Sequence, residues 1–190
     1  MKAIFLVLVI LSAQISVVSG QEESHSIQCH HVISVSIINE AGLDGVRLSI
    51  IKEAVFSKGD YISGNHVYYK GWAGALEAIG SDYTLKLSGD SNTDITIILT
   101  KESNQVYAGF TTVHDLGYIE SGTIFIYDAD HVPDTALGNV ARHEMGHALG
   151  LKHLTTTSSI MYPIIPYATK YISTFDLNAL KSEIGTGKCM

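Results

Sequence analysis

The chain has few basic residues, and this shortage narrows the functions it could have. Among its 190 residues, 12 are Lys or Arg and 19 are Asp or Glu, so the formal net charge is −7. No basic cluster offsets this balance, and we therefore expect no binding to nucleic acid. The sequence also lacks low-complexity tracts, internal repeats and Asn-x-Ser/Thr sites, so neither a repeat array nor N-glycosylation is expected.

Long apolar runs are missing after the first twenty residues. The chain begins MKAIFLVLVILSAQISVVSG, in which Lys2 is the one charge and the last residues are small. A positive start, a short apolar core and a small-residue cleavage site are typical of a secretory signal peptide. The apolar core is short for a membrane span, and an uncleaved N-terminal anchor is the alternative. We predict a signal peptide at 1–20, secretion without a stable membrane anchor, and one domain at 21–190.

Only two cysteines are present, Cys29 and Cys189, near the two ends of the exported chain. An even pair of cysteines in an exported protein most simply forms one disulfide. In the chain-entropy model, closing so long a loop stabilises the fold by roughly 4–5 kcal/mol at most. The alternative is two free thiols, one of which could meet a metal ion.

Hydrophobic periodicity predicts both strands and helices. Alternating β-branched residues indicate strands, whereas apolar residues at helical spacing indicate helices. We predict strands at 31–38, 83–89, 94–100, 106–113 and 122–128, and helices at 43–58, 132–150 and 173–185. Ser173 and Asp176 form a capping-box variant at the start of the last helix. Residues 59–80 are rich in Gly and Tyr and show no clear period. The mixed order favours a sheet with a few helices packed on it.

Metal-binding side chains are concentrated in HEMGHALGLKH, residues 143–153. Positions i and i+4 of a helix lie on one face, so His143 and His147 present two imidazoles side by side. Gly150 can adopt the left-handed conformation that ends a helix, which makes His153 the natural third ligand. Three protein ligands leave one zinc position open, which is typical of catalytic rather than structural sites.

Glu144 lies next to a predicted ligand without being one. It can hold a water molecule that zinc activates, accept its proton as general base and pass that proton to a leaving amine. Peptide hydrolysis needs these parts. A chance match at five fixed positions has odds on the order of one in 10⁴, which disfavours the alternative of a helix with surface histidines. Gly146, on the same helix, can relieve crowding because it has no side chain.

The motif resembles that of the metzincin zinc proteases, HExxHxxGxxH followed by a Met-turn. The segment SSIMYP places Met161 eight residues after His153, and the two motifs look most like the matrixin branch, the catalytic domains of matrix metalloproteinases. DITIILT and STFDLNALKSEIG are similar to that family's third strand and last helix. The resemblance is specific over 94–185 and weaker over 31–93. In the family the methionine packs beneath the metal, which implies structural support of the site for Met161.

The resemblance implies a fold and an activity. The fold would be the metzincin-like zincin fold of the α+β class, a twisted mixed five-stranded sheet with three helices and an active-site helix followed by the Met-turn. The activity would be that of a secreted zinc-dependent endopeptidase with one catalytic Zn2+. A protein or peptide substrate would bind extended along the cleft, against an antiparallel edge strand at 106–113. Residues 162–172 would form the wall of the main side-chain pocket.

Two features of the family are missing. Only KESNQ separates two strands where the family has a long loop that holds structural zinc and calcium. We therefore read the nearby candidate ligands as turn residues and expect neither a second zinc nor calcium. These residues are His114, Asp115, Asp128, Asp130 and His131. The family's prodomain cysteine is also absent, and Cys29 could reach the metal only if the N-terminus folded back. Activity would otherwise be restrained by secretion, a protein inhibitor or another partner.

The alternative function is a non-catalytic, zinc-containing secreted binding protein with the same fold. Glu144 disfavours this alternative because a non-catalytic descendant need not keep the base. Loss of cleavage on Glu144→Ala would separate the two functions.

Overall fold

A computed structural model describes residues 31–90, 92–104, 107–114 and 121–184. The predicted signal peptide, Cys29 and Cys189 lie outside these residues, so secretion and the disulfide stay predictions. In chain order the elements are β1 (His31–Asn39), α1 (Gly45–Phe56), β2 (Asp60–Ser63), β3 (His66–Tyr69), α2 (Trp72–Ala78), β4 (Tyr83–Leu87), β5 (Ile95–Leu99), β6 (Gly109–His114), β7 (Ser121–Ile126), α3 (Asp134–Ala148) and α4 (Thr174–Ile184).

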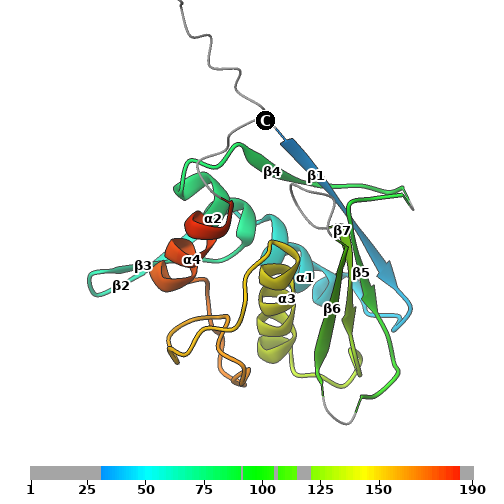
Figure 1. Cartoon of the computed structure of the whole chain (residues 1–190). Coiled ribbons are helices and arrows are strands. Elements are labelled where there is room, and N and C mark those ends of the chain that lie inside the picture. The colour runs from blue at the N-terminus through cyan, green and yellow to red at the C-terminus, as the bar shows by residue number, and fades with distance from the viewer. Residues whose placement is uncertain (1–30, 91, 105–106, 115–120, 185–190) are drawn as a thin grey trace, which may run out of the picture.

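Five strands form one mixed sheet in the order β4-β1-β5-β7-β6 (Figure 1). The β1–β4, β1–β5 and β5–β7 pairs are parallel, whereas β6 runs antiparallel to β7 and forms one edge. Alternate residues of β5, namely Ile95, Ile97 and Leu99, are fully buried, as expected for an inner strand with one face on the core. The predicted mixed sheet with an antiparallel edge strand is thus confirmed.

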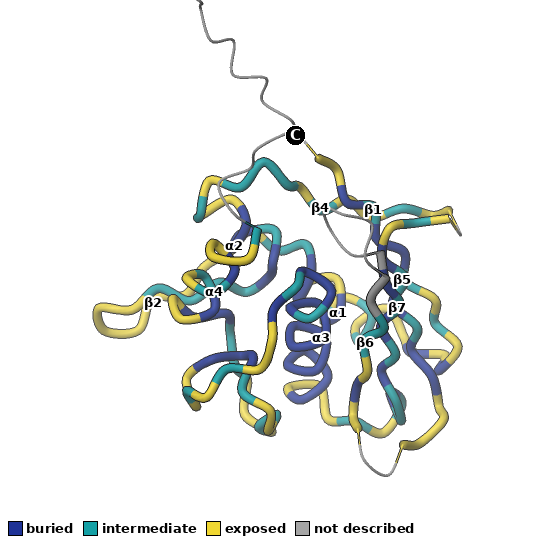
Figure 2. Tube along the Cα trace, in the orientation of Figure 1, coloured by how far each residue is buried: buried dark blue, intermediate teal, exposed yellow. Residues whose placement is uncertain are grey.

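Helix α3, which contains the first two histidines of the motif, is the most deeply buried of the described helices. It packs against α1 and against the β6–β7 edge of the sheet, and Figure 2 shows it dark along nearly its whole length. Its buried residues include the polar and charged Asn139, Arg142, His143 and Glu144. Because buried polar groups are costly unless they have partners, this concentration marks α3 as the element around which a site is built.

The prediction of three helices is wrong, because the described residues hold four. The unpredicted helix is α2, within the stretch that shows no clear period. Trp72 at its start is fully buried, and its Nε1–H donates to the carbonyl of Arg142 at 2.7 Å. A Cβ on the preceding Gly71 would overlap the carbonyl oxygen of Glu53, so the two backbones meet directly there. Tertiary packing, rather than a sequence period, therefore stabilises this short helix.

The same stretch forms an unpredicted hairpin of β2 and β3. Gly64 and Asn65 connect the two strands, and Gly64 has φ +59°, the conformation that the first loop residue of a type II′ hairpin requires. The hairpin projects from the helical side of the molecule, away from the five-stranded sheet (Figure 1). A single bridge between Tyr69 and Ile172 ties it to the segment that precedes α4.

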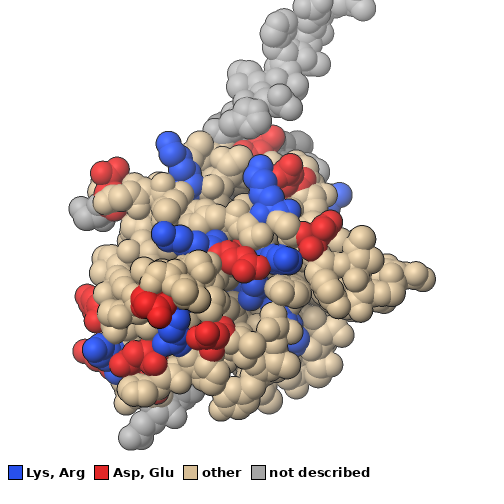
Figure 3. All heavy atoms as spheres, turned by 180° about the vertical axis from the view of Figure 1, so that it is seen from behind, with Lys and Arg blue, Asp and Glu red and all other residues tan. Residues whose placement is uncertain are grey.

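The surface carries charges of both signs. On the face turned away from the view of Figure 1, acidic and basic side chains are interspersed rather than gathered by sign (Figure 3). Within the described residues, no helix has both the length and the apolar character that a bilayer crossing requires.

Candidate metal centre and active site

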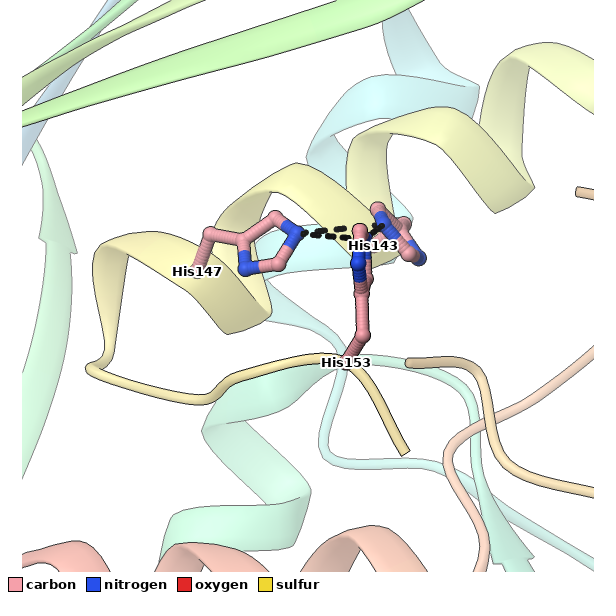
Figure 4. A group of neighbouring side chains, drawn as sticks. All are labelled: His143, His147 and His153. Atoms are coloured by element: carbon pink, nitrogen blue, oxygen red, sulfur yellow. Dashed lines mark hydrogen bonds between the residues drawn. The ribbon is translucent and has the colours of Figure 1, made fainter. Parts of the chain in front are cut away.

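Three histidines from α3 and the loop after it converge on one point (Figure 4). His143 and His147 lie one turn apart on the helix, and His153 approaches from the loop. Their Nε2 atoms are 3.2 Å apart for the first pair, 3.2 Å for His143 and His153, and 3.3 Å for His147 and His153. The structure thus brings together the three predicted ligands, which we call the histidine group.

The chain reverses direction at Gly150, and this turn returns His153 to the helix. Gly150 has φ +89°, in the left-handed region where a residue without Cβ is favoured. Its N–H donates to the carbonyl of His147 at 2.9 Å, and the N–H of Leu151 donates to that of Gly146 at 2.9 Å. These two bonds make a Schellman motif. The glycine spacing in the sequence therefore corresponds to a defined helix ending.

Backbone carbonyls fix the second nitrogen of two of the rings. Nδ1 of His143 lies 2.8 Å from the carbonyl oxygen of Ile160, and Nδ1 of His147 lies 2.8 Å from that of Leu151. A carbonyl can only accept, so each Nδ1 carries the hydrogen and each Nε2 presents a lone pair. The Nε2 contact between His143 and His147, drawn in Figure 4, therefore brings two lone pairs together and is not a satisfied hydrogen bond.

Lone pairs that face one another at this spacing suit a cation. Ligand atoms at about 2.0–2.1 Å around a tetrahedral zinc ion lie roughly 3.3–3.4 Å apart, close to the nitrogen separations here. Burial lowers the pKa of His143 to about 4 and also lowers that of His147, so both rings are neutral near pH 7. Neutral imidazole is the form that binds metal. The histidine group thus fits zinc, with one coordination position left over.

Glu144 lies beside the histidine group and is only 5% exposed. Burial raises the pKa of Glu144 to about 7. The hydroxyl of Thr111, which donates to Glu144 Oε2 at 2.6 Å, opposes this shift because it favours the charged form. A carboxyl group with a pKa near neutrality can both accept and return a proton. The sequence analysis did not single out Thr111. Its place in the predicted edge strand at 106–113 was the one signal that pointed to the site.

Met161 is fully buried, in the turn that also supplies the carbonyl of Ile160 to His143 Nδ1. Its sulfur fills the space next to Gly146. A Cβ on Gly146 would overlap that sulfur and would lie 2.9 Å from Cζ2 of Trp72. Met161 thus packs against the helix that carries two of the candidate ligands, and its role as structural support of the site stays a prediction.

Asp176 of α4 anchors this turn, although sequence reasoning did not place it at the site. Its fully buried carboxylate accepts the N–H of Ile160 at 3.1 Å and that of Ser173 at 2.8 Å. The hydroxyls of Ser159 and Ser173 also donate to it. Since the carbonyl of Ile160 accepts from a candidate ligand, the last helix is connected to the histidine group. The sequence did single out Asp176 as part of a capping-box pattern, but that pattern indicated only the start of a helix and not a link to the site.

A cleft with a volume of about 800 Å³ passes the histidine group. One wall is residues 107–111, which include the start of β6, and the other includes Pro163, Ile164 and Ile165. The second wall falls within the segment 162–172 predicted to line the main side-chain pocket. Buried Asn139 on α3 holds this segment, donating to the carbonyls of Pro166 and Ala168 and accepting the N–H of Lys170 at 2.8 Å.

A second cluster of ligand-type side chains lies in the turn after β7. Asp128, Asp130 and His131, which we call the turn group, have ligand atoms within 4.8 Å of one another. His131 Nδ1 lies 2.9 Å from Asp128 Oδ1 and 3.3 Å from Asp130 Oδ1. These are turn residues, as predicted, but their proximity means that a single metal ion per chain stays a prediction. His114 belongs to β6, and Asp115 lies outside the described residues.

The geometry is that of a three-histidine centre with one open position, the class that catalytic zinc sites form. The family model described as Matrixin matches residues 60–182. Because this match covers more than half of the chain, the chain belongs to the matrixin family, a family of zinc metallopeptidases within the metzincins. The match includes the hairpin and α2, where the sequence resemblance was weak. A search of curated proteins found no match.

Proposed function

We propose that the protein is a zinc-dependent endopeptidase in which the histidine group holds one ion and Glu144 is the general base. The observation that carries this proposal is the convergence of three Nε2 atoms beside a buried carboxyl group, inside a cleft. Bound zinc would polarise the scissile carbonyl and make a water molecule more nucleophilic. Family membership supports the metal and the peptidase activity.

Glu144 moves the proton in this proposal. Its carboxylate accepts a proton from the attacking water and then donates it to the amine nitrogen as the C–N bond breaks. The position of the carboxyl suits both transfers, because Glu144 lines the same cleft as the histidine group. Burial of the carboxyl also excludes bulk water that would compete for the same proton.

A protein or peptide substrate would bind in extended form against β6. Among the described strands β6 pairs only with β7, so the main-chain groups along its other edge are available for an added strand. Phe110 and Ile164, both exposed and on opposite walls of the cleft, would contact substrate side chains. An apolar substrate side chain suits such walls.

Secretion and the disulfide are part of the same proposal and rest on the sequence. We infer removal of residues 1–20, pairing of Cys29 with Cys189, and restraint of activity by secretion, a protein inhibitor or another partner. The non-catalytic alternative gains no support from the site, because Glu144 is both present and oriented beside the histidine group.

The test uses the protein from residue 21 onward, oxidised and loaded with zinc. It is incubated with a proteome-derived peptide library, new termini are mapped by mass spectrometry, and Glu144→Ala is treated in parallel. We expect internal cleavage by the parent protein and none by the variant, with equal zinc content in both. A folded, zinc-loaded parent that cleaves nothing, also as Cys29→Ser, would support the binding protein instead.

A further inference from the structure

Two residues of β6 enclose the side chain of Glu144. Gly109 and Thr111 are two positions apart on the strand, so both face α3. A Cβ on Gly109 would lie 2.6 Å from Cγ and 2.7 Å from Oε1 of Glu144, closer than real Cβ atoms approach. On the other carboxylate oxygen, the Thr111 hydroxyl donates to Oε2 at 2.6 Å. The strand therefore contacts both ends of the carboxylate.

The hydroxyl of Thr111 lies within hydrogen-bonding distance of two acceptors, and the distances indicate which one accepts its hydrogen. It lies 2.6 Å from Glu144 Oε2 and 3.1 Å from the backbone carbonyl oxygen of the same residue. A hydroxyl has one hydrogen, and bonds to a carboxylate are shorter and stronger than bonds between neutral groups. The hydrogen therefore goes to the side chain, and Thr111 fixes the direction in which the carboxylate points.

Gly109 contributes by leaving space. The missing Cβ would also lie 2.8 Å from Cγ1 of Val140, one turn before Glu144 on α3. Any larger residue at this position would press on both α3 side chains at once. Glu144 has three rotatable side-chain bonds, and a side chain of that kind is held in one orientation only when its surroundings restrict it.

We propose that β6 is a holder for the base, in which Gly109 and Thr111 are positioning residues that fix the Glu144 carboxylate beside the histidine group. This inference rests on the proposed function and deepens it. The outer edge of the same strand would bind the substrate backbone. The same strand would therefore position both the substrate peptide bond and the Glu144 carboxylate, and so fix the distance between them.

Variants of neighbouring threonines separate positioning from packing. Thr111→Val keeps the shape and the β-branching but removes the donor, whereas Thr111→Ser keeps the donor. Thr112→Val is the matched control, because Thr112 is the next residue of β6 and its hydroxyl donates to the carbonyl of Thr123 instead, at 3.3 Å. Zinc content and thermal midpoint are measured for each variant alongside kcat and KM.

We expect Thr111→Val to lower kcat by about 10- to 100-fold, a part of the 10²- to 10⁴-fold that general acid–base catalysis contributes, with KM and zinc content unchanged. Thr111→Ser should recover most of the parent kcat, and Thr112→Val should match the parent. A kcat for Thr111→Val within twofold of the parent would overturn the proposal. An equal loss in Thr111→Ser would overturn it too, because the hydroxyl would then not be the cause.

A second readout does not depend on activity. In crystals of the zinc-loaded parent, the Glu144 carboxylate should lie against Gly109 and Thr111, and in Thr111→Val and Gly109→Ala it should occupy other rotamers. If the Glu144 side chain kept the parent rotamer in both variants, the proposal that β6 positions it would be overturned. If the parent cleaves no peptide, the proposed function fails, and these crystal structures alone decide whether β6 positions Glu144.

Discussion

The histidine group and the turn group each bring three ligand atoms within 4.8 Å, yet they are organised in opposite ways. In the histidine group, the Nδ1 atoms of His143 and His147 are bonded to backbone carbonyls, which leaves Nε2 lone pairs facing the centre. In the turn group, the ring of His131 already points at Asp128 and Asp130. The comparison teaches that proximity alone does not orient ligand atoms toward a common centre, which bonds to backbone carbonyls do for His143 and His147.

The two groups also differ in what lies beneath them. His143 is 3% exposed on α3, and the fully buried Met161 packs against Gly146 of the same helix. The side chains of His131 and Asp128 are 76% and 46% exposed, and they extend from a turn. Exposed ligands are less restricted by packing, so we expect ion binding there to cost more side-chain entropy than it does on a packed helix. Each prediction below changes one side of this comparison.

The largest effect is expected from His147→Ala. Losing one of three ligands should lower zinc affinity by more than the 10- to 100-fold that loss of an outer supporting group costs, and cleavage should fall with it. The number of zinc ions per chain, measured by inductively coupled plasma mass spectrometry after gel filtration, should drop from about one to near zero. His131→Ala is the matched control, expected to keep both zinc and cleavage. Loss of the ion in the control instead would reverse the assignment.

An intermediate effect concerns the metal-free protein and pH. The pKa of His143 is lowered to about 4, so the unfolded state binds the extra proton and stability is lost as pH falls from about 6.5 to 4. The pKa of Glu144 is raised to about 7, so the folded state binds the extra proton and stability is lost as pH rises from about 4.5 to 7. Between these limits the two contributions oppose each other.

Glu144→Gln removes one of these two contributions. We expect the unfolding free energy of the metal-free variant to rise by a few kcal/mol between pH 4 and 6.5, more steeply than that of the parent. Urea unfolding across this pH range measures the slope. Parallel slopes for the two proteins would show that Glu144 does not titrate there.

The spacing of the histidine motif predicted which three histidines the fold brings together, because they lie close in sequence and helix geometry alone places two of them. Thr111 and Asp176 could not be predicted, since Thr111 meets Glu144 from 33 residues away. No local pattern links a threonine on a strand to a glutamate on a helix. Contacts of this kind exist only once the sheet edge has packed on α3.

The fold shows the same division. β5 was predicted from a run of β-branched and apolar residues, which specify a buried strand without help from other segments. The helix α2 was missed because its glycines argue against a helix, and because Trp72 and Gly71 acquire their partners from α3 and α1 only in the folded state. Local propensity is a weak guide where tertiary contacts decide.

The smallest effect is expected from Gly146→Ala, which tests the support beneath the histidine group. Alanine favours a helix by about 1 kcal/mol over glycine, but its Cβ would overlap the sulfur of Met161. We expect a net loss of about 1–3 kcal/mol, as in other overpacked cores, with zinc still bound. Gly138→Ala is the control, because its Cβ would meet only the ends of two side chains, those of Arg142 and Ile50. Equal stability of the two variants would contradict the supporting role.

The most direct measurement of the central claim is an anomalous difference map at the zinc edge, from crystals of the protein given one equivalent of zinc. The account predicts one peak, about 2.0–2.1 Å from Nε2 of each of His143, His147 and His153. It predicts no peak at the turn group. A map whose main peak lies at Asp128 and His131, or that has no peak at the histidine group, would contradict it.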